Sequence, residues 1–285
     1  MRLCQFQNRR IGLVQGDTVR DVTACLEELR PQRYPYAHGD ALIAALPRLA
    51  PLLPQLAAQA AAIPLAQVQL TSPVANPSKI IGAPVNYRRH LEEVRADPAL
   101  HHRQQIEEIQ RIGLFLKATS SLIGPDQPIR IRHPERRTDH EVELAVIIGT
   151  ECDRVSPQDA LGCVAGYCIG LDITVRGPEE RSLRKSLDTY TVLGPWMVTA
   201  DELGDPADLA LSLAVDGELR QSARTSELLL DVPALIALAT SFYRLLPGDV
   251  ILTGTPAGVG PLVAGNHLRA TIERIGSMTV AVTAG

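Results

Sequence analysis

Three acidic residues beside two apolar stretches limit most strongly what this chain can fold into. Glu141 and Glu143 stand two apart in DHEVELAVII (139–148), and Asp172 directly follows CVAGYCIGL (163–171). The apolar residues predict two β-strands, and a strand places residues two apart on the same face. Buried carboxylates are costly unless positive charge lies between them. The pattern therefore predicts that three carboxylates converge on a cation at one end of a β-structure.

The simplest such cation is Mg²⁺, which proteins often hold with a few carboxylates while water and substrate fill its other positions. We therefore predict a metalloenzyme in which Glu141, Glu143 and Asp172 bind Mg²⁺. The alternative is an edge strand whose acidic face simply meets solvent, as half-buried strands often do.

Composition excludes several other classes of protein. A chain of 285 residues is long enough for one large domain and a small one. Its net charge of −4 and aromatic content of 4% give no support to nucleic-acid binding. Five cysteines without a CxxC pair fit buried thiols in a reducing cytoplasm. The sequence has no hydrophobic leader and no apolar run of about 18 residues, so we expect a cytoplasmic protein without a membrane partner.

The first part of the chain differs in character from the rest. Residues 1–24 predict short strands, and the Ala/Leu-rich residues 40–70 predict helices that prolines interrupt. TSPVANP (71–77) has the composition of a linker. We therefore predict a small N-terminal α+β domain, residues 1–72, and a catalytic domain, residues 73–285.

The second part predicts more strands than helices. Residues 79–85 and 250–253 read as strands, and the polar stretch 86–112 as helical with a break near Pro98. Residues 232–246 predict a helix that ends at Pro-Gly, a common helix stop. The expected fold class is therefore α+β, mainly β.

His90 and Glu93 are three residues apart in a predicted helix, so they project from the same face and can pair. A carboxylate that holds an imidazole in one tautomer makes it a better base, and such a pair could activate water. The alternative is an ordinary exposed contact between the two side chains.

Four further residues are candidates for binding an anionic substrate. Arg176 and Lys185 follow the aspartate and could neutralise the carboxylates or hold an acid beside the metal. The alternative is a charged surface loop, to which we expect Arg181 and Arg184 to belong. Lys117 is a lone cation in a weakly polar run, where an internal salt bridge is the alternative. Thr255 lies in the glycine-rich loop TGTPAGVG (253–260), whose amides and hydroxyl could bind a carboxylate, although a simple tight turn is the alternative.

Six segments in a fixed order resemble the fumarylacetoacetate hydrolase superfamily, from residue 79 to about 280. The segments are KIIGAPVNYRRHLEE, FLKATSSLIGP, DHEVELAVIIG, VAGYCIGLDITVR, KSLDTYTVLGPWMVTADEL and PGDVILTGTPAGVG. The resemblance implies a mixed β-roll, usually in a homodimer, with a small variable N-terminal domain.

The resemblance also implies roles for the candidate residues. It implies that Glu141, Glu143 and Asp172 bind Mg²⁺, or Mn²⁺ or Ca²⁺ as in some members, and that a water-activating dyad lies on a segment that closes as a lid. The catalytic candidates are His90, Glu93 and Lys185. The substrate-binding candidates are Arg176, Lys117 and Thr255.

The sequence departs from the family pattern in three places. The usual Arg-Asp-x-Gln is Arg176-Gly177-Pro178-Glu179, so an acid replaces a neutral amide. The loop between Asp172 and Lys185 is shorter than in most relatives, and Ala118-Thr119 replaces the more usual Pro-Pro. The first two changes lie where the substrate is expected to bind.

We therefore predict a Mg²⁺-dependent hydrolase that cleaves a carbon–carbon bond in a 2-oxo or 1,3-diketo acid, such as an acylpyruvate or fumarylacetoacetate, in the catabolism of aromatic compounds. The alternatives are a decarboxylase, isomerase or keto–enol tautomerase with the same metal site, and a non-catalytic binding protein of the same fold. The pair of His90 and Glu93 favours hydrolysis, because attack by water needs a base.

Overall fold

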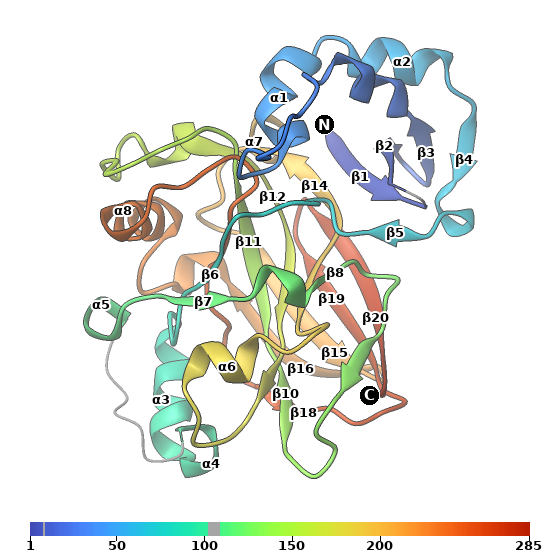
Figure 1. Ribbon diagram of the computed structural model, residues 1–285. Helices are drawn as coiled ribbons and strands as arrows, with labels where there is room; N and C mark the ends of the chain where they lie inside the picture. The colour runs from blue at the N-terminus through green and yellow to red at the C-terminus, as the bar shows by residue number, and fades with distance from the viewer. Residues whose placement is uncertain (8, 102–108) are drawn as a thin grey trace.

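The computed structural model describes residues 1–7, 9–101 and 109–285, and Figure 1 shows their arrangement. Within these residues the chain forms twenty strands and eight α-helices. The predicted class, α+β and mainly β, is confirmed.

Strands from the N-terminal part and from the predicted catalytic part of the chain join in one large sheet. β1 pairs with β14 antiparallel, so the N-terminal strands continue the sheet that carries the candidate carboxylates. In spatial order its main path is β4 (Ala62–Pro64), β3 (Thr18–Asp21), β2 (Arg10–Gln15), β1 (Arg2–Phe6), β14 (Thr191–Thr199), β12 (Val164–Asp172), β11 (Val142–Ile148), β17 (Val250–Leu252), β6 (Ile80–Gly82) and β7 (Phe115–Lys117). Two further strands pair off this path, β5 (Leu70–Thr71) with β1 and β8 (Leu122–Ile123) with β14.

Two smaller sheets complete the strand layers. One has the order β13 (Thr174–Val175), β10 (Thr138–His140) and β18 (Gly260–Pro261). The other has the order β16 (Glu218–Arg224), β15 (Ala210–Val215), β19 (His267–Ile272), β20 (Gly276–Ala284) and β9 (Ile129–Ile131).

The predicted strand at 139–148 is divided between two sheets. β10 ends at His140 and β11 begins at Val142, because β10 pairs with β13 and β18 while β11 pairs with β12 and β17. Glu141 lies at the point where the chain passes from one sheet to the other. This junction, rather than a single continuous strand, sets the position of its carboxylate.

β11 is buried along its whole length, which makes it a rigid support for the site. Leu144 and Val146 pack into the larger hydrophobic core, whereas Ala145 and Ile147 pack into a second core. Ile43 of α1 (Ala41–Leu49) belongs to that second core. The N-terminal part of the chain therefore covers the back of the strand that carries Glu143.

Of the region 40–70 that was predicted as helical, residues 41–59 form α1 and α2 (Leu53–Gln59), with the break at residues 50–52. The helical prediction is wrong beyond them, because β4 pairs with β3 and β5 pairs with β1. Pro54 occupies the first turn of α2, where the missing N–H costs nothing, whereas Pro47 lies inside α1. Among the described residues, no single helix is both long and apolar enough to cross a membrane. α1 and α2 pass that test by length and composition only as a pair, across a bend of 86°.

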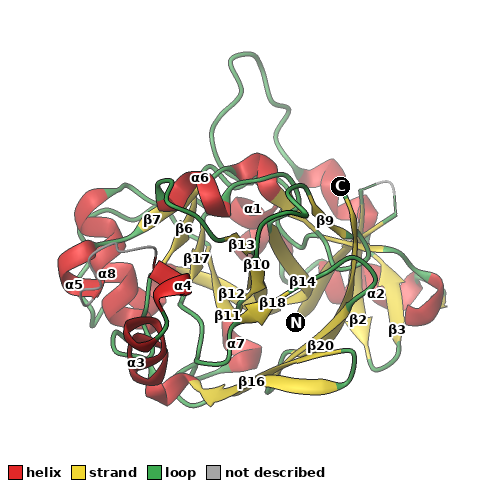
Figure 2. Ribbon diagram, turned by 90° about the horizontal axis from the view of Figure 1, so that it is seen from below, coloured by secondary structure: helices red, strands yellow, loops and turns green. Residues whose placement is uncertain are grey.

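The predicted break near Pro98 is confirmed, because α3 (Arg88–Ala96) ends before it and α4 (Pro98–His101) starts at it. α5 (Ile109–Ile112) follows, and residues 102–108 of the predicted helical stretch lie outside the described residues. Figures 1 and 2 both place α3, α4 and α5 on one side of the strands.

One predicted helix ends earlier than expected, and two short helices were not predicted. α8 (Val232–Phe242) ends four residues before the predicted position, because Leu245 instead pairs in an extended conformation with Cys152. Two short helices, α6 (Arg181–Lys185) and α7 (Ala200–Leu203), precede and follow β14.

Candidate metal centre

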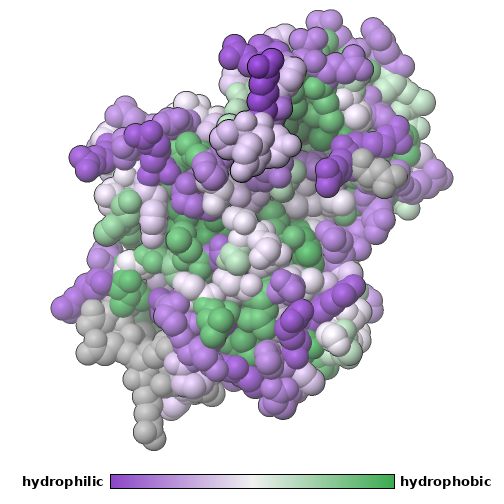
Figure 3. All heavy atoms as spheres, in the orientation of Figure 1, coloured by the Kyte–Doolittle hydropathy of each residue, from purple (hydrophilic) through white to green (hydrophobic). Residues whose placement is uncertain are grey.

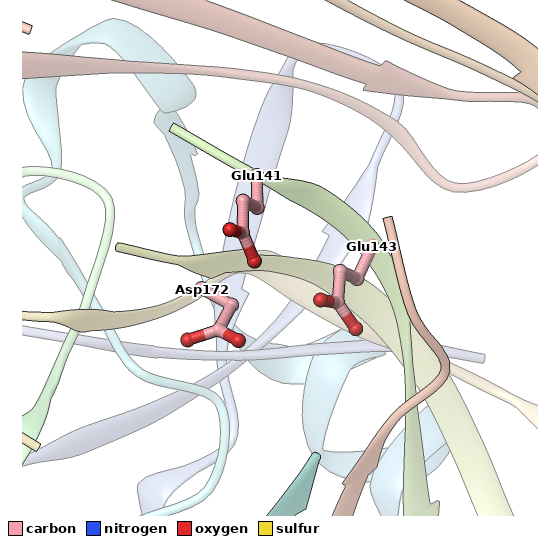
Figure 4. A group of neighbouring side chains, drawn as sticks. All are labelled: Glu141, Glu143 and Asp172. Atoms are coloured by element: carbon pink, nitrogen blue, oxygen red, sulfur yellow. The ribbon is translucent and has the colours of Figure 1, made fainter. Parts of the chain in front are cut away.

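Three carboxylates meet where β11 and β12 lie side by side. The antiparallel register pairs Glu143 with Gly170, and the Asp172 N–H donates to the Glu141 carbonyl at 2.9 Å. One oxygen from each of Glu141, Glu143 and Asp172 lies within 4.8 Å of the others, and all three residues are buried. Figure 4 shows the three carboxylates directed into a common space. The structure therefore brings together the residues that the sequence predicts as metal ligands.

Two cations neutralise part of this charge. The Lys185 ammonium donates to Glu141 Oε2 at 2.7 Å, to Asp172 Oδ2 at 2.6 Å and to the Thr174 hydroxyl at 2.7 Å. Arg176 Nη2 donates to Glu141 Oε1 at 2.9 Å. Burial alone would raise the pKa of Glu141, but Lys185 and then Arg176 outweigh it and lower the pKa to about 2. Glu141 is therefore ionised at neutral pH.

Lys117 is placed behind the carboxylates. Its ammonium donates to Asp172 Oδ1 and, at 2.8 Å, to the Tyr190 carbonyl, and the residue is buried. The residues that line the neighbouring pocket include Lys185 but not Lys117. This geometry favours the internal salt bridge, and contact between Lys117 and a substrate stays a prediction.

Glu143 has far less compensation. Its Oε2 accepts the Gly254 N–H at 2.5 Å, and within the described ranges no Lys, Arg or His pairs with it. Burial, then Asp172 and Glu141, raise the pKa of Glu143 well above its ordinary value. A divalent cation among the three carboxylates would supply the missing positive charge, and carboxylate oxygens suit a hard cation. The donor set therefore fits a metal ion.

The predicted dyad is formed at the start of α3. His90 Nδ1 lies 2.7 Å from Glu93 Oε2, and His90 is buried. Because an ionised carboxylate only accepts hydrogen bonds, Nδ1–H of His90 is the donor in this pair, and in the neutral imidazole Nε2 then carries the lone pair. His90 is also among the positive groups that lower the pKa of Glu141. That the dyad and the carboxylates act in one site stays a prediction.

Glu93 also joins α3 to the glycine-rich loop. Its second oxygen, Oε1, accepts the Gly258 N–H at 2.9 Å. The position of His90 therefore depends on both α3 and the loop at 253–260.

A small pocket of about 60 Å³ opens over the carboxylates. Its charged part includes the three carboxylates together with Arg176, Lys185 and Thr255, and its apolar wall includes Val94, Leu100 and Phe115. Such a combination suits a small organic acid whose charged end lies on the polar side.

Asp139 is a site residue that the sequence did not identify. It is buried and accepts from Arg137 Nε and from Arg176 Nε, both at 2.7 Å. Arg176 is thus held between Asp139 and Glu141. The acidic run around Asp139 was the available signal.

Gln221 is a second unpredicted residue, on β16. Its side-chain oxygen accepts the Val142 N–H at 3.1 Å, and its side-chain nitrogen donates to the Thr255 hydroxyl oxygen at 2.7 Å. Because Thr255 accepts this bond, its own hydroxyl hydrogen is available to an anion in the pocket. Nothing near Gln221 in the sequence signals this role.

Glu179, the acid in place of the family's amide, faces another arginine. Its carboxylate accepts two hydrogen bonds from Arg136, at 3.1 Å and 2.7 Å, which lowers the pKa of Glu179. Arg136 also donates to the Arg176 carbonyl at 2.8 Å. The acid therefore ties Arg136 to the segment that carries Arg176.

Comparisons with known proteins identify the family of the chain. Residues 79–283 match the family model described as fumarylacetoacetate (FAA) hydrolase C-terminal. The chain is 52% identical over 284 residues to maleylpyruvate hydrolase of Aquipseudomonas alcaligenes, covering 99% of each protein. It is 35% identical to the mitochondrial oxaloacetate tautomerase Fahd2a of Rattus norvegicus, over 78% of this chain and 71% of the relative. The crystal structure of maleylpyruvate hydrolase from Sphingobium sp. SYK-6 in complex with manganese(II) ion and pyruvate has a TM-score of 0.85 and 42% identity, covering 100% of both chains.

Proposed function

The chain belongs to the fumarylacetoacetate hydrolase family and is a metal-dependent hydrolase of carbon–carbon bonds; from this premise we propose that its substrate is an acylpyruvate of the maleylpyruvate type, in aromatic catabolism. The observation that carries the proposal is the His90–Glu93 dyad beside three buried carboxylates. Hydrolysis needs both a base for water and a site for the 2-oxo acid.

Glu141, Glu143 and Asp172 would hold the divalent cation, which we propose to be Mg²⁺, with Mn²⁺ and Ca²⁺ as alternatives. The Sphingobium relative contains manganese together with pyruvate. When bound, such a cation supplies Lewis-acid stabilisation of negative charge on a 2-oxo acid.

The chain's own residues account for the proton transfers. Glu93 holds the proton on His90 Nδ1, so Nε2 takes a proton from water as the water oxygen bonds to the acyl carbonyl carbon. The bond from that carbon to the neighbouring methylene then breaks. Its electron pair remains on the departing fragment as the enolate of pyruvate, and the proton returns to the methylene carbon. The products are a carboxylic acid and pyruvate.

Arg176, Lys185 and Thr255 would orient the 2-oxo acid end. All three line the pocket. The three N–H donors of Lys185 are committed to Glu141, Asp172 and Thr174, so Lys185 would contribute positive charge beside the carboxylates. A homodimer and a cytoplasmic location complete the proposal.

The test is an assay of the purified protein with maleylpyruvate, acetylpyruvate and oxaloacetate, each with Mg²⁺, with Mn²⁺ and with EDTA. We expect one pyruvate for each acylpyruvate consumed, no turnover in EDTA, and recovery when Mg²⁺ is restored. Interconversion of keto and enol oxaloacetate without pyruvate formation would indicate a tautomerase instead. Release of carbon dioxide would indicate a decarboxylase, and no turnover of any acid would indicate a binding protein.

A further inference from the structure

The short helix α6 has an inverted arrangement of polar and apolar side chains. Arg184 and Lys185 are buried, with 5% and 6% of their surface exposed, whereas Leu183 is 63% exposed. Figure 3 shows hydrophobic side chains at the surface in the region of α6. Surface helices normally do the reverse, because burying charge is costly. A helix that turns its charges inward therefore serves the pocket rather than stability.

Two of the inward cations lack acidic partners. Lys185 and Arg176 pair with the carboxylates, but within the part of the chain that the structure describes no acidic side chain forms an ion pair with Arg181 or Arg184. Arg184 Nε donates to the Glu179 carbonyl at 2.8 Å, and the Arg181 guanidinium lies 5.8 Å from the centre of the Phe115 ring. Both arginines line the pocket. The expectation that they belong to a charged surface loop is therefore wrong, because both lie in α6 and Arg184 is buried.

The close approach of several positive charges also affects the pKa of Arg184. Burial lowers the pKa of Arg184, and the neighbouring cations Arg176 and Arg181 lower it further. At the base of the pocket, Glu141 and Asp172 already pair with Arg176, Lys185 and Lys117. Among the described residues, the charges of Arg181 and Arg184 are therefore not taken up by an ion pair at the base of the pocket.

We propose that Arg181 and Arg184 bind a second carboxylate, at the acyl end of the substrate, and so select dicarboxylic acylpyruvates over those with a neutral acyl chain. This inference rests on the proposed function. In the proposed function, the 2-oxo acid end lies at the cation that the three carboxylates would hold. The acyl group then extends into the rest of the pocket, which α6 lines. Guanidinium groups match a carboxylate with paired hydrogen bonds, and maleylpyruvate has a carboxylate at each end.

The experiment compares kcat/KM for maleylpyruvate and acetylpyruvate in the wild type, Arg181→Gln and Arg184→Gln. We expect each variant to lose about 10- to 100-fold for maleylpyruvate, the range for a hydrogen-bonded charge, mainly through KM. For acetylpyruvate, which has no second carboxylate, we expect a change of less than about twofold. Arg244→Gln is the matched control, because Arg244 is exposed and pairs with Glu151 away from the pocket.

Arg181→Gln is the deciding variant, because Arg184 also supports the backbone at Glu179. If the ratio of the two kcat/KM values in Arg181→Gln equals that of the wild type, the inference is overturned, whether neither value falls or both fall by the same factor. Turnover by the wild type would leave the proposed function standing in that case. If the wild type cleaves neither acylpyruvate, the proposed function fails, and the inference fails with it.

Discussion

At the scale of single residues, Glu143 is the carboxylate that most needs a cation. Glu141 and Asp172 accept from buried cations, but Glu143 accepts a backbone N–H from Gly254. A buried ionised carboxylate without a countercharge is unfavourable, so the folded protein stores a local penalty that a divalent ion relieves. Metal binding at this position should therefore stabilise the fold as well as serve catalysis.

Glu143→Gln should remove both effects. The neutral amide keeps the shape but removes the charge, so we expect loss of metal binding and of activity together. In the wild type, Mg²⁺ at about 100 times its Kd should stabilise the fold by about 2.7 kcal/mol, measured as a rise in Tm. The variant should show no rise, although in EDTA it should be at least as stable as the wild type. Glu151→Gln, at an exposed position, is the control; full activity in Glu143→Gln would refute the ligand assignment.

Residues whose place is set by a local strand pattern were easier to predict than residues whose place depends on distant side-chain contacts. The Glu-x-Glu spacing and the aspartate after a strand indicated the three carboxylates, because register in a sheet brings neighbouring strand ends together. Gln221 could not be found this way, since its partners Val142 and Thr255 are separated from it by 79 and 34 positions in the sequence. Lys117 was ambiguous in sequence for the same reason.

At the scale of elements, the site depends on how α3 meets the loop at 253–260. One carboxylate oxygen of Glu93 accepts a hydrogen bond from the Gly258 N–H, and the other pairs with His90 Nδ1. Gly258 has a φ of +99°, and a Cβ there would overlap the Arg220 carbonyl oxygen. Only glycine fits, so the loop conformation and the orientation of the base are linked.

Gly258→Ala should therefore lower kcat without removing the metal. The added methyl group displaces the loop and Glu93 loses one partner. We expect a decrease in kcat of about 10- to 100-fold, less than the roughly 10²–10⁴-fold that complete loss of a general base costs. The rise in Tm with Mg²⁺ should persist. Gly265→Ala is the matched control, since Gly265 has a φ of +101° but no described atom lies within 4 Å of its added Cβ. A normal kcat in Gly258→Ala would show that the loop does not position the dyad.

Element boundaries were predicted less well than element types. The apolar run at 139–148 gave a strand, but its division at Glu141 arises from pairing with β13 and β18, which are distant in sequence. The end of α8 was assigned to Pro247-Gly248, yet Leu245 forms a bridge with Cys152 and ends the helix earlier. In both cases a tertiary partner overrode a sound local signal.

At the scale of the whole molecule, the N-terminal strands and helices share a core with the catalytic part. Leu3 and Ile43 belong to the same buried cluster as Ile147, Cys168 and Met197. The boundary at residue 72 stays a prediction, because a linker-like composition is compatible with either separate or joint folding. The shared cluster and the β1–β14 pairing favour joint folding.

Ile43→Ala tests whether the N-terminal part and the catalytic part of the chain unfold together. Ile43 is fully buried on α1, so its truncation should cost about 2–5 kcal/mol. If the two parts unfold together, this loss should appear equally in Trp196 fluorescence, which reports on β14, and in hydrogen exchange of β2 and β3. Leu161→Ala, at a position that is 40% exposed, should change stability by no more than about 0.5 kcal/mol.

Lower protection of β2 and β3 with an unchanged Trp196 transition would instead establish an independent N-terminal domain. Joint unfolding would mean that the back of β11, and with it the position of Glu143, is held by residues more than 90 positions away in the sequence.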